Sequence, residues 1–332
     1  MTSATTVNAA GIQPQPAFPA GILVPGAPSR LMRIGLHALG IGAGARRPVV
    51  DALARAAEEH GFSTLWAGEH VVMVDSPLSR YPYNDQGEIP VPADADWLDP
   101  LICLSFAAAA THTITLATGV LLLPEHNPVL IAKQAASLDV MSGGRFTLGV
   151  GIGWSRDEFV ALGVPYSRRA NRTVEYVRAI KQLWSEDVAT FHGQFVDFDA
   201  IRVYPKPVRD RRVPVVFGGN SDPALARAAA HGDGWYGFNL SGIGDVRRCV
   251  AAIREHCARL DRDFDRLDLS VSVVDFGTDE LDELADVGVN ELVLVDAPPP
   301  RAGDVGEWVR ELAQRWLVGT ASQSEPGCGG EA

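Results

Sequence analysis

The sequence predicts an α/β protein built as a single (β/α)8 barrel, with insertion segments at the carboxyl-terminal face of its strands. Strand-like and helix-like patterns alternate from Met32 to Leu317. Most of the strand patterns are apolar along their whole length, which indicates parallel strands covered by helices. Eight such units in roughly 290 residues match the usual size of a closed barrel. An open, doubly wound sheet is the alternative fold that the pattern allows.

Proline, aspartate and glycine delimit the elements of the first half. Pro48 stands where the first helix would begin, and Gly61 follows its end. Asp99 and Pro100 open the second helix, and Gly143 closes the third. On these signals strands are expected at 32–39, 64–67, 114–123 and 145–150, and helices at 48–61, 99–110, 128–141, 155–162 and 168–184.

The second half repeats the alternation after a polar, strand-like excursion at 190–207. Pro223 marks a helix start, and Gly288 stops the last helix but one. Strands are expected at 213–217, 234–238, 269–274 and 292–296, and helices at 223–231, 244–260, 279–287 and 305–316.

Two segments, 71–97 and 186–212, are longer than ordinary loops. Long loops in a compact domain usually serve a site. The first follows a strand end, which is the catalytic face of a barrel, so we expect it to form a lid or a pocket wall.

The two ends of the chain differ from the barrel domain, which is expected to span 31–318. Residues 1–30 are rich in Ala, Pro and Gly and have neither a basic start nor a compact apolar run. We therefore expect a flexible N-terminal extension at 1–30 and a flexible C-terminal tail at 319–332.

Charge and composition exclude several classes of function. The 332 residues include 29 Lys and Arg against 41 Asp and Glu, a formal net charge of −12. This acidity does not suit a general nucleic-acid binder or a protein that docks on anionic membranes. No apolar run reaches the roughly 18–20 residues of a membrane span. Cys103, Cys249, Cys257 and Cys328 form no CxxC pair, so we expect reduced thiols in a cytoplasmic protein.

Functional residues of a parallel barrel collect where its strands end. Several chemically distinctive residues stand at or just beyond the expected strand ends. They are His37, Glu69, His70, Thr118, Gly119, Val120, Gly151, Gly153, Trp154, Gly218, Gly219 and Asn220.

Two of these groups are rich in glycine. Gly218, Gly219 and Asn220 directly precede a helix, where free backbone N–H groups attract phosphate, although a tight turn would look the same. The GVGIG run at 149–153 lacks the spacing of a dinucleotide fingerprint. We interpret it as a strand end kept bare so that a flat ring can lie against the backbone.

His70, next to Glu69, is the candidate acid or base, because a carboxylate neighbour orients an imidazole. Successive strand residues point to opposite faces, however, so the two side chains need not touch. His37, His70 and His126 have no HxH or HxxxH spacing, and no metal is expected. Basic groups for an anionic ligand are available at Arg168, Arg169 and Arg172.

Apart from His37, the strand-end residues lie in or beside four segments: AEEHGFSTLWAGEHVV, LATGVLLLPEHNPVLIAKQAASLDVMSGGRFTLGVGIGW, DEFVALGVPYSRRANRTVEYVRAIKQLW and VPVVFGGNSDPALARAAAHGDGWY. In this order they resemble the bacterial luciferase-like superfamily of flavin and deazaflavin oxidoreductases. The segment YPYNDQGEIPVPADADWLDPL is most similar to its actinobacterial branch of coenzyme F420-dependent oxidoreductases.

The resemblance implies a role for each of these residues. The cofactor ring would lie at the carboxyl-terminal mouth, in front of a non-prolyl cis bond at Gly119–Val120, with the phosphate on 218–220. Glu69 and His70 would contact the ring and the substrate, with Glu where Asp is usual. Trp154 stands where the sugar-phosphate dehydrogenases carry a catalytic Glu, which argues against glucose-phosphate oxidation. The other residues expected to border the cofactor are His37, Thr118, Gly151 and Gly153.

The expected function is hydride transfer between coenzyme F420, a 5-deazaflavin, and a small organic substrate at the barrel mouth. His70 would move the accompanying proton. The alternative is an FMN-dependent luciferase-like monooxygenase supplied with reduced flavin by a partner reductase. A third alternative is a flavin-binding barrel without catalysis. The expected partners are an F420 or flavin reductase and a second copy of the chain in a homodimer.

Overall fold

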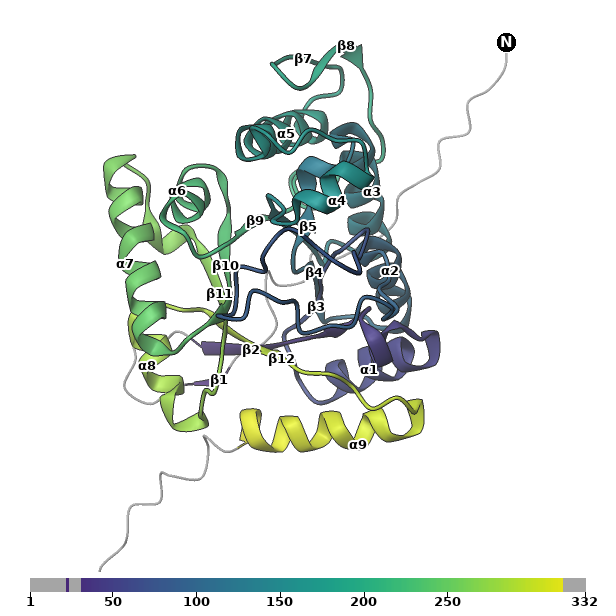
Figure 1. Ribbon diagram of the computed structural model, residues 1–332, viewed down its shortest axis with the longest axis vertical. Coiled ribbons are helices and arrows are strands. Elements are labelled where there is room, and N and C mark those ends of the chain that lie inside the picture. Colours follow the sequence, from purple (N-terminus) through teal and green to yellow (C-terminus); the bar gives the residue numbers. More distant parts are fainter. Residues whose placement is uncertain (1–21, 24–30, 319–332) are drawn as a thin grey trace, which may run out of the picture.

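The computed structural model describes residues 22–23 and 31–318, and its centre is a closed ring of parallel strands (Figure 1). The strand β12 pairs in parallel with β2, and β2 with β3, which closes the ring. The (β/α)8 barrel is therefore confirmed. Around the ring the strands are β2 (Leu31–Leu39), β3 (Thr64–Ala67), β4 (Thr115–Thr118), β6 (Phe146–Gly151), β9 (Val215–Gly218), β10 (Gly234–Leu240), β11 (Asp268–Val273) and β12 (Glu291–Val295).

Helices surround the ring, as Figure 1 shows. Local sequence starts them as expected: the Asp99 side chain accepts from the Ile102 backbone N–H at 2.9 Å, and Asn127 accepts from Val129 at 2.9 Å. The helices are α1 (Arg47–Glu59), α2 (Pro100–Ala110), α3 (Pro128–Met141), α4 (Arg156–Ala161), α5 (Arg169–Ser185), α6 (Asp222–His231), α7 (Ile243–Arg259), α8 (Leu281–Val287) and α9 (Ala302–Ala313). Short helical turns lie at Gly42–Ala45, Leu123–Glu125, Phe264–Arg266, Thr278–Glu280 and Gln314–Val318.

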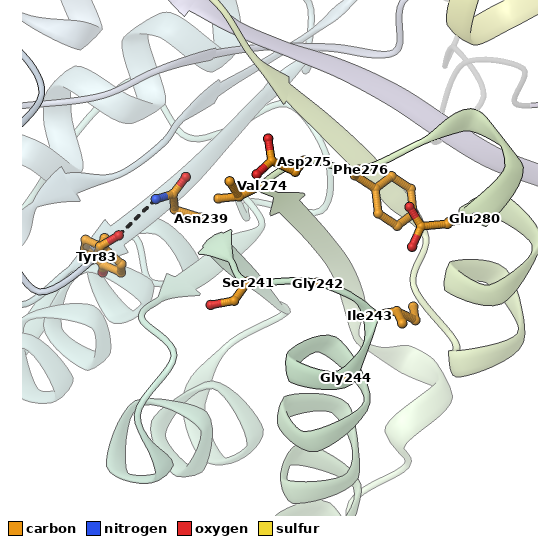
Figure 2. Close-up of a pocket in the computed structure, with 10 residues that line it drawn as sticks. All are labelled: Tyr83, Asn239, Ser241, Gly242, Ile243, Gly244, Val274, Asp275, Phe276 and Glu280. Atoms are coloured by element: carbon orange, nitrogen blue, oxygen red, sulfur yellow. Dashed lines mark hydrogen bonds between the residues drawn. The ribbon is translucent and has the colours of Figure 1, made fainter. Parts of the chain in front are cut away.

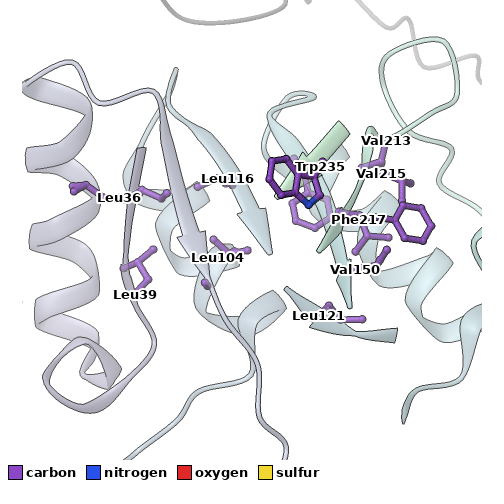
Figure 3. Packing of buried hydrophobic residues seen from close by; sticks show 14 of the residues in the cluster. Leu36, Leu39, Leu104, Leu116, Leu121, Val150, Val213, Val215, Phe217 and Trp235 are labelled. Atoms are coloured by element: carbon purple, nitrogen blue, oxygen red, sulfur yellow. The ribbon is translucent and has the colours of Figure 1, made fainter. Parts of the chain in front are cut away.

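The main hydrophobic core lies between the strands and the helices. Leu36 of β2, Leu104 of α2 and Leu116 of β4 belong to it and are fully buried (Figure 3). A smaller cluster of strand residues is separate from this core. In it Trp66 of β3 stacks on Tyr236 of β10, with ring centroids 4.5 Å apart. Both aromatic side chains are buried and lie below the strand ends, so they form a solid floor under the mouth of the barrel.

The structure differs from the sequence prediction at the third strand of the ring. The expected continuous strand 114–123 is divided into β4 and β5 (Leu121–Leu122). The peptide bond between Gly119 and Val120, which joins the two parts, is cis, as the family resemblance implied. An apolar run is therefore not enough to predict an unbroken strand.

The long segments and the chain ends complete the description. The polar excursion is a two-stranded antiparallel hairpin, β7 (Ala189–His192) and β8 (Asp197–Ile201). Within the expected extension 1–30, Ile22–Leu23 forms β1, which pairs antiparallel with β2. The rest of that extension and the expected tail 319–332 lie outside the described residues. In the part of the chain that the structure covers, no helix is long and apolar enough to cross a bilayer.

Candidate active site

A cavity of about 720 Å³ opens at the carboxyl ends of the strands. The segment 71–97 forms one wall of it, through Tyr81, Tyr83 and Trp97, as expected for a pocket wall. All but one of the site residues expected from the sequence line this cavity. They are His37, Glu69, His70, Gly119, Val120, Gly151, Gly153, Trp154, Gly218, Gly219 and Asn220.

Thr118 is the exception. Its side chain is fully buried, and its hydroxyl donates to the backbone oxygen of Gly149 at 2.7 Å. From this position Thr118 joins β4 to β6 and does not face the cavity. The expectation that Thr118 borders the cofactor is corrected, because strand residues alternate in direction and this one points away from the mouth.

Val120 lines the cavity, and glycines on the neighbouring strand ends leave room for its side chain. A Cβ on Gly151 would lie 2.7 Å from Val120 Cγ2, and a Cβ on Gly218 would lie 3.0 Å from Val120 Cγ1. Neither strand end could carry a side chain without displacing the valine. The result is a cradle of bare backbone with one apolar side chain at its centre, here called the Val120 cradle.

His70 is held by a carboxylate from another part of the chain. Its Nδ1 lies 2.9 Å from Oε2 of Glu158, which is completely buried at the start of α4. The other oxygen of Glu158 accepts from the backbone N–H groups of Val71 at 2.6 Å and Val72 at 3.1 Å. A carboxylate that accepts from two amides is an acceptor toward His70 as well, so Nδ1 carries the proton and Nε2 is left for the cavity.

The start of α4 also binds the first part of the segment 71–97, residues 71–79. The Asp157 carboxylate accepts from the backbone N–H groups of Leu78 at 3.1 Å and Ser79 at 3.0 Å. The backbone N–H of Arg156 donates to the Ser79 hydroxyl at 2.8 Å. Three consecutive residues of α4, 156–158, thus hydrogen-bond to residues 71–79.

Glu69 points to a different set of partners from its neighbour His70, as the alternation of strand residues allows. One oxygen accepts from the backbone N–H of Leu122 at 2.6 Å, and His126 Nε2 lies 3.0 Å from the carboxylate. Burial lowers the pKa of His126, but the hydrogen bond and charge of Glu69 outweigh it and raise the pKa overall. Through these bonds the carboxylate of Glu69 joins the end of β3 to β5 and to the residues that follow it.

A third acid, Glu125, lies behind the cavity wall. Among the described residues nothing bonds to either of its buried carboxyl oxygens. Burial, followed by the charges of Glu158 and Glu69, raises its pKa to about 9. At neutral pH this carboxyl group is therefore protonated. Its Oε1 lies 2.9 Å from the place that a Cβ on Gly153 would take.

His37 lies at the floor of the cavity, where its Nδ1 is 2.9 Å from the Tyr236 hydroxyl. Burial lowers the pKa of His37 to about 4, so the ring is neutral at physiological pH. Burial also raises the pKa of Tyr236 well above its ordinary value. This pair offers neutral hydrogen-bonding groups to a ligand.

The far end of the cavity is suited to an anion. Gly219, with a positive φ of 104°, precedes Ser221 at the start of α6, where the helix has free backbone N–H groups. The guanidinium groups of Arg169 and Arg227 line the same cavity. The pKa of Arg227 is lowered by burial first and then by Arg169, so two like charges lie close together here.

The side chain of Asn220 is turned away from this end. Its Nδ2 donates to the backbone oxygen of Phe238 at 2.7 Å, and its Oδ1 is buried with no hydrogen-bond partner in the described part of the chain. Any contact of Asn220 with an anion would therefore come from its backbone. Of the other candidate arginines, Arg168 bonds to Gln194 and Arg172 to the backbone oxygen of Pro165, and neither lines the cavity.

A second cavity, of about 590 Å³, lies beside the first at the ends of β10 and β11 (Figure 2). Tyr83 lines both cavities, and its backbone oxygen accepts from Asn239 Nδ2 at 3.0 Å. Ser241, Asp275 and Glu280 make this second cavity polar. The Tyr83–Asn239 bond holds the segment 71–97 down on its far side.

Sequence reasoning did not single out Glu158 and Arg227. Glu158 lies in the first turn of α4, where an acid is usual for the helix alone. Arg227 lies one turn into α6, and only the Pro223 helix start and the phosphate-type turn before it hint at its position.

Comparison with known proteins identifies the family of this chain. The luciferase-like monooxygenase family matches residues 36–288. The chain belongs to this family. The luciferase-like monooxygenase family and its structural neighbours are oxidoreductases and monooxygenases, which supports an enzyme of this class.

Three proteins illustrate the range of similarity within the luciferase-like fold. An uncharacterized protein of Mycobacterium tuberculosis is 34% identical over 265 residues, 80% of this chain and 92% of that protein. The FMNH2-dependent dimethylsulfone monooxygenase of Pseudomonas putida is 35% identical over 153 residues, 45% of this chain and 42% of that enzyme. A solved F420-dependent secondary alcohol dehydrogenase superposes with a TM-score of 0.68 at 19% identity, covering 86% of this chain and 98% of that one.

Proposed function

We propose that this protein is an oxidoreductase that exchanges a hydride between coenzyme F420 and a small organic substrate. The observation that carries the proposal is the arrangement around one cavity. It has the Val120 cradle at its centre, an arginine pair at one end and the His70–Glu158 pair at its wall. A flat, phosphorylated redox cofactor would use all three features.

The residues present fit such a cofactor. The Val120 cradle, which Gly151 and Gly218 keep free of side chains, would hold one face of the ring. Backbone N–H groups at the start of α6, with Arg169 and Arg227, would hold the phosphate. When bound, the deazaflavin supplies or accepts a hydride.

The protein's own groups would handle the proton. Glu158 fixes the tautomer of His70, so that Nε2 accepts a proton from, or donates one to, the substrate oxygen. The neutral His37–Tyr236 pair orients polar atoms at the floor without adding charge. The segment 71–97, which forms one wall of the cavity, would exclude water from that side of the reacting atoms.

Titration of the purified apoprotein with F420 and with FMN, followed by fluorescence, tests the proposal. We expect saturable binding of F420, and turnover with a substrate that requires it. Arg227→Gln is expected to weaken that binding, while Arg247→Gln, an exposed arginine on α7 paired with Glu283, is the matched control. Tight binding of FMN with no binding of F420 contradicts the proposal.

A second candidate function is an FMN-dependent monooxygenase served by a separate reductase. The similarity to the dimethylsulfone monooxygenase, 35% over 153 residues, favours it. It predicts oxygen consumption in the presence of reduced FMN. Ligand binding without turnover of any substrate would leave the third candidate, a flavin-binding barrel.

We also propose that the chain forms a homodimer through α2 and α3. These helices expose the large apolar side chains of Ile102, Phe106, Leu130 and Met141. Light scattering is expected to give twice the 35.5 kDa chain mass, and Ile102→Glu is expected to lower it. A monomeric wild-type protein contradicts this proposal.

A further inference from the structure

We infer that the substrate lacks an anionic group and has an aromatic or alicyclic body with an oxygen at its reacting end. The inference rests on the proposed function, because it assigns to the cofactor the end of the cavity that carries the arginines. It concerns the other end, between the Val120 cradle and the segment 71–97.

This end is bordered by an unbroken series of aromatic rings, here called the aromatic belt. Successive ring centroids lie 5.0 to 5.6 Å apart, and each pair meets edge to face. The belt comes from the end of β10, the segment 71–97, the residue His70 after β3 and the residue Trp154 after β6. Its members, in order, are Phe238, Tyr83, Tyr81, Trp154, His70 and Trp97.

The belt determines which class of ligand binds with the highest affinity. Edge-to-face rings expose both ring faces and ring edges, against which a flat or cyclic apolar guest buries its surface, and an aromatic guest gains a ring–ring contact as well. Ile89 and Val91 from the same segment extend the apolar wall. The cavity must also hold the cofactor ring, which limits the size of the substrate.

No free cationic group in this part of the cavity would balance a negative charge on the substrate. Among the residues that line the cavity, Arg169 donates from Nε to the backbone oxygen of Gly153 at 2.9 Å and is assigned with Arg227 to the phosphate of the cofactor. Glu69 is bonded to Leu122 and His126. Asp296 is exposed to solvent at the rim.

Burial lowers the pKa of His37 to about 4 and raises the pKa of Tyr81 and Tyr83, so these three groups are neutral. An anionic substrate would lose its hydration here without gaining a counter-ion, which is costly. A substrate hydroxyl can donate to His70 Nε2, and a hydroxyl or carbonyl oxygen can accept from the two phenols.

The test compares two probes with the same body: acetonaphthone and its ring-carboxylated analogue. Binding to the full-length protein is measured by calorimetry, with and without F420. We expect the dissociation constant of acetonaphthone to be at least about tenfold lower than that of the carboxylated analogue. Tyr81→Ala is expected to weaken acetonaphthone binding about threefold to tenfold. Leu78→Ala, in the same segment but 92% exposed, is the matched control and is expected to change nothing.

Each outcome decides the inference. A carboxylated analogue that binds as tightly as acetonaphthone overturns it, and so does a Tyr81→Ala variant that behaves like Leu78→Ala. The F420 titration is a separate measurement. Failure of F420 to bind, with selectivity for the neutral probe intact, contradicts the proposed function and not the character of the belt.

Discussion

His70 Nδ1 and Glu158 Oε2 lie 2.9 Å apart, although the two residues are separated by 88 positions in the chain. The pair joins the end of β3 to the first turn of α4, across the mouth of the barrel. Because Glu158 is fully buried and its second oxygen binds backbone amides, the imidazole has one orientation and one tautomer.

The first prediction concerns this tautomer. Glu158→Gln keeps the size of the side chain but can present an amide N–H to Nδ1, which moves the ring proton to Nε2. We expect kcat to fall about 10²-fold, with a changed pH profile and little change in cofactor affinity. Steady-state kinetics across pH, with cofactor titration, measures these effects.

Asp157→Asn provides the comparison for that variant. It weakens the neighbouring bonds to Leu78 and Ser79 without touching His70, so it is expected to raise KM more than it lowers kcat. If both variants change kcat and KM in the same proportion, Glu158 only fastens the segment and does not position His70.

The second prediction concerns Glu125 and the pH dependence of stability. Its folded-state pKa of about 9 lies above the ordinary 4.5, so the folded protein binds one more proton than the unfolded chain between these values. Stability is therefore lost as pH rises through this window. Glu125→Gln removes this pH dependence. The free energy of unfolding of the variant, minus that of the wild type, is therefore expected to grow by about 1 kcal/mol per pH unit between pH 6 and 8.

Urea unfolding of both proteins at several pH values measures this difference. The sign is that of a carboxyl group held neutral by burial and by the nearby charges of Glu158 and Glu69. Parallel curves of unfolding free energy against pH would show that Glu125 is ionised in the folded protein.

The third prediction tests the Val120 cradle. A methyl group on Gly151 would come within 2.7 Å of Val120 Cγ2, so Gly151→Ala pushes the valine into the space for the ring. We expect cofactor binding to weaken at least about tenfold, a loss of about 1.4 kcal/mol, while circular dichroism shows a folded barrel. The double variant Gly151→Ala/Val120→Ala is expected to recover binding; no recovery would place the steric conflict elsewhere.

The fourth prediction separates the phosphate from the ring. Arg227→Gln is expected to weaken F420 binding about tenfold, as the loss of a charge-assisted contact would, and to leave binding of the phosphate-free deazaflavin unchanged. The same ligands titrated against Arg247→Gln serve as the reference. Equal losses for F420 and the phosphate-free deazaflavin would mean that Arg227 supports the fold of α6 and not the phosphate.

The sequence predicts the barrel well because parallel strands and their helices carry strong local signals. Proline and glycine at helix ends, such as Pro128 and Gly143, give boundaries close to those of α3. The division of the strand 114–123 has only a weak local signal, the glycine at 119, which is compatible with a bulge but does not specify a cis bond.

The site is only partly predictable for a related reason. Strand ends identify His70 and the glycines around Val120, since topology alone brings those ends together. The partner of His70 depends on where α4 starts relative to β3, which is a tertiary property. For the same reason the neighbour Glu69, which looked like the partner, turns to Leu122 and His126 instead.

The fastening of residues 71–79 by 156–158 has a consequence for how such enzymes diverge. Insertions or deletions before Ser79 would break the bonds that Arg156, Asp157 and Glu158 make, and would misplace the imidazole. Beyond Ser79, at 80–96, length and composition are free to change without that penalty. New substrate preferences are thus able to arise by remodelling one half of a single loop while the machinery for proton handling is inherited intact.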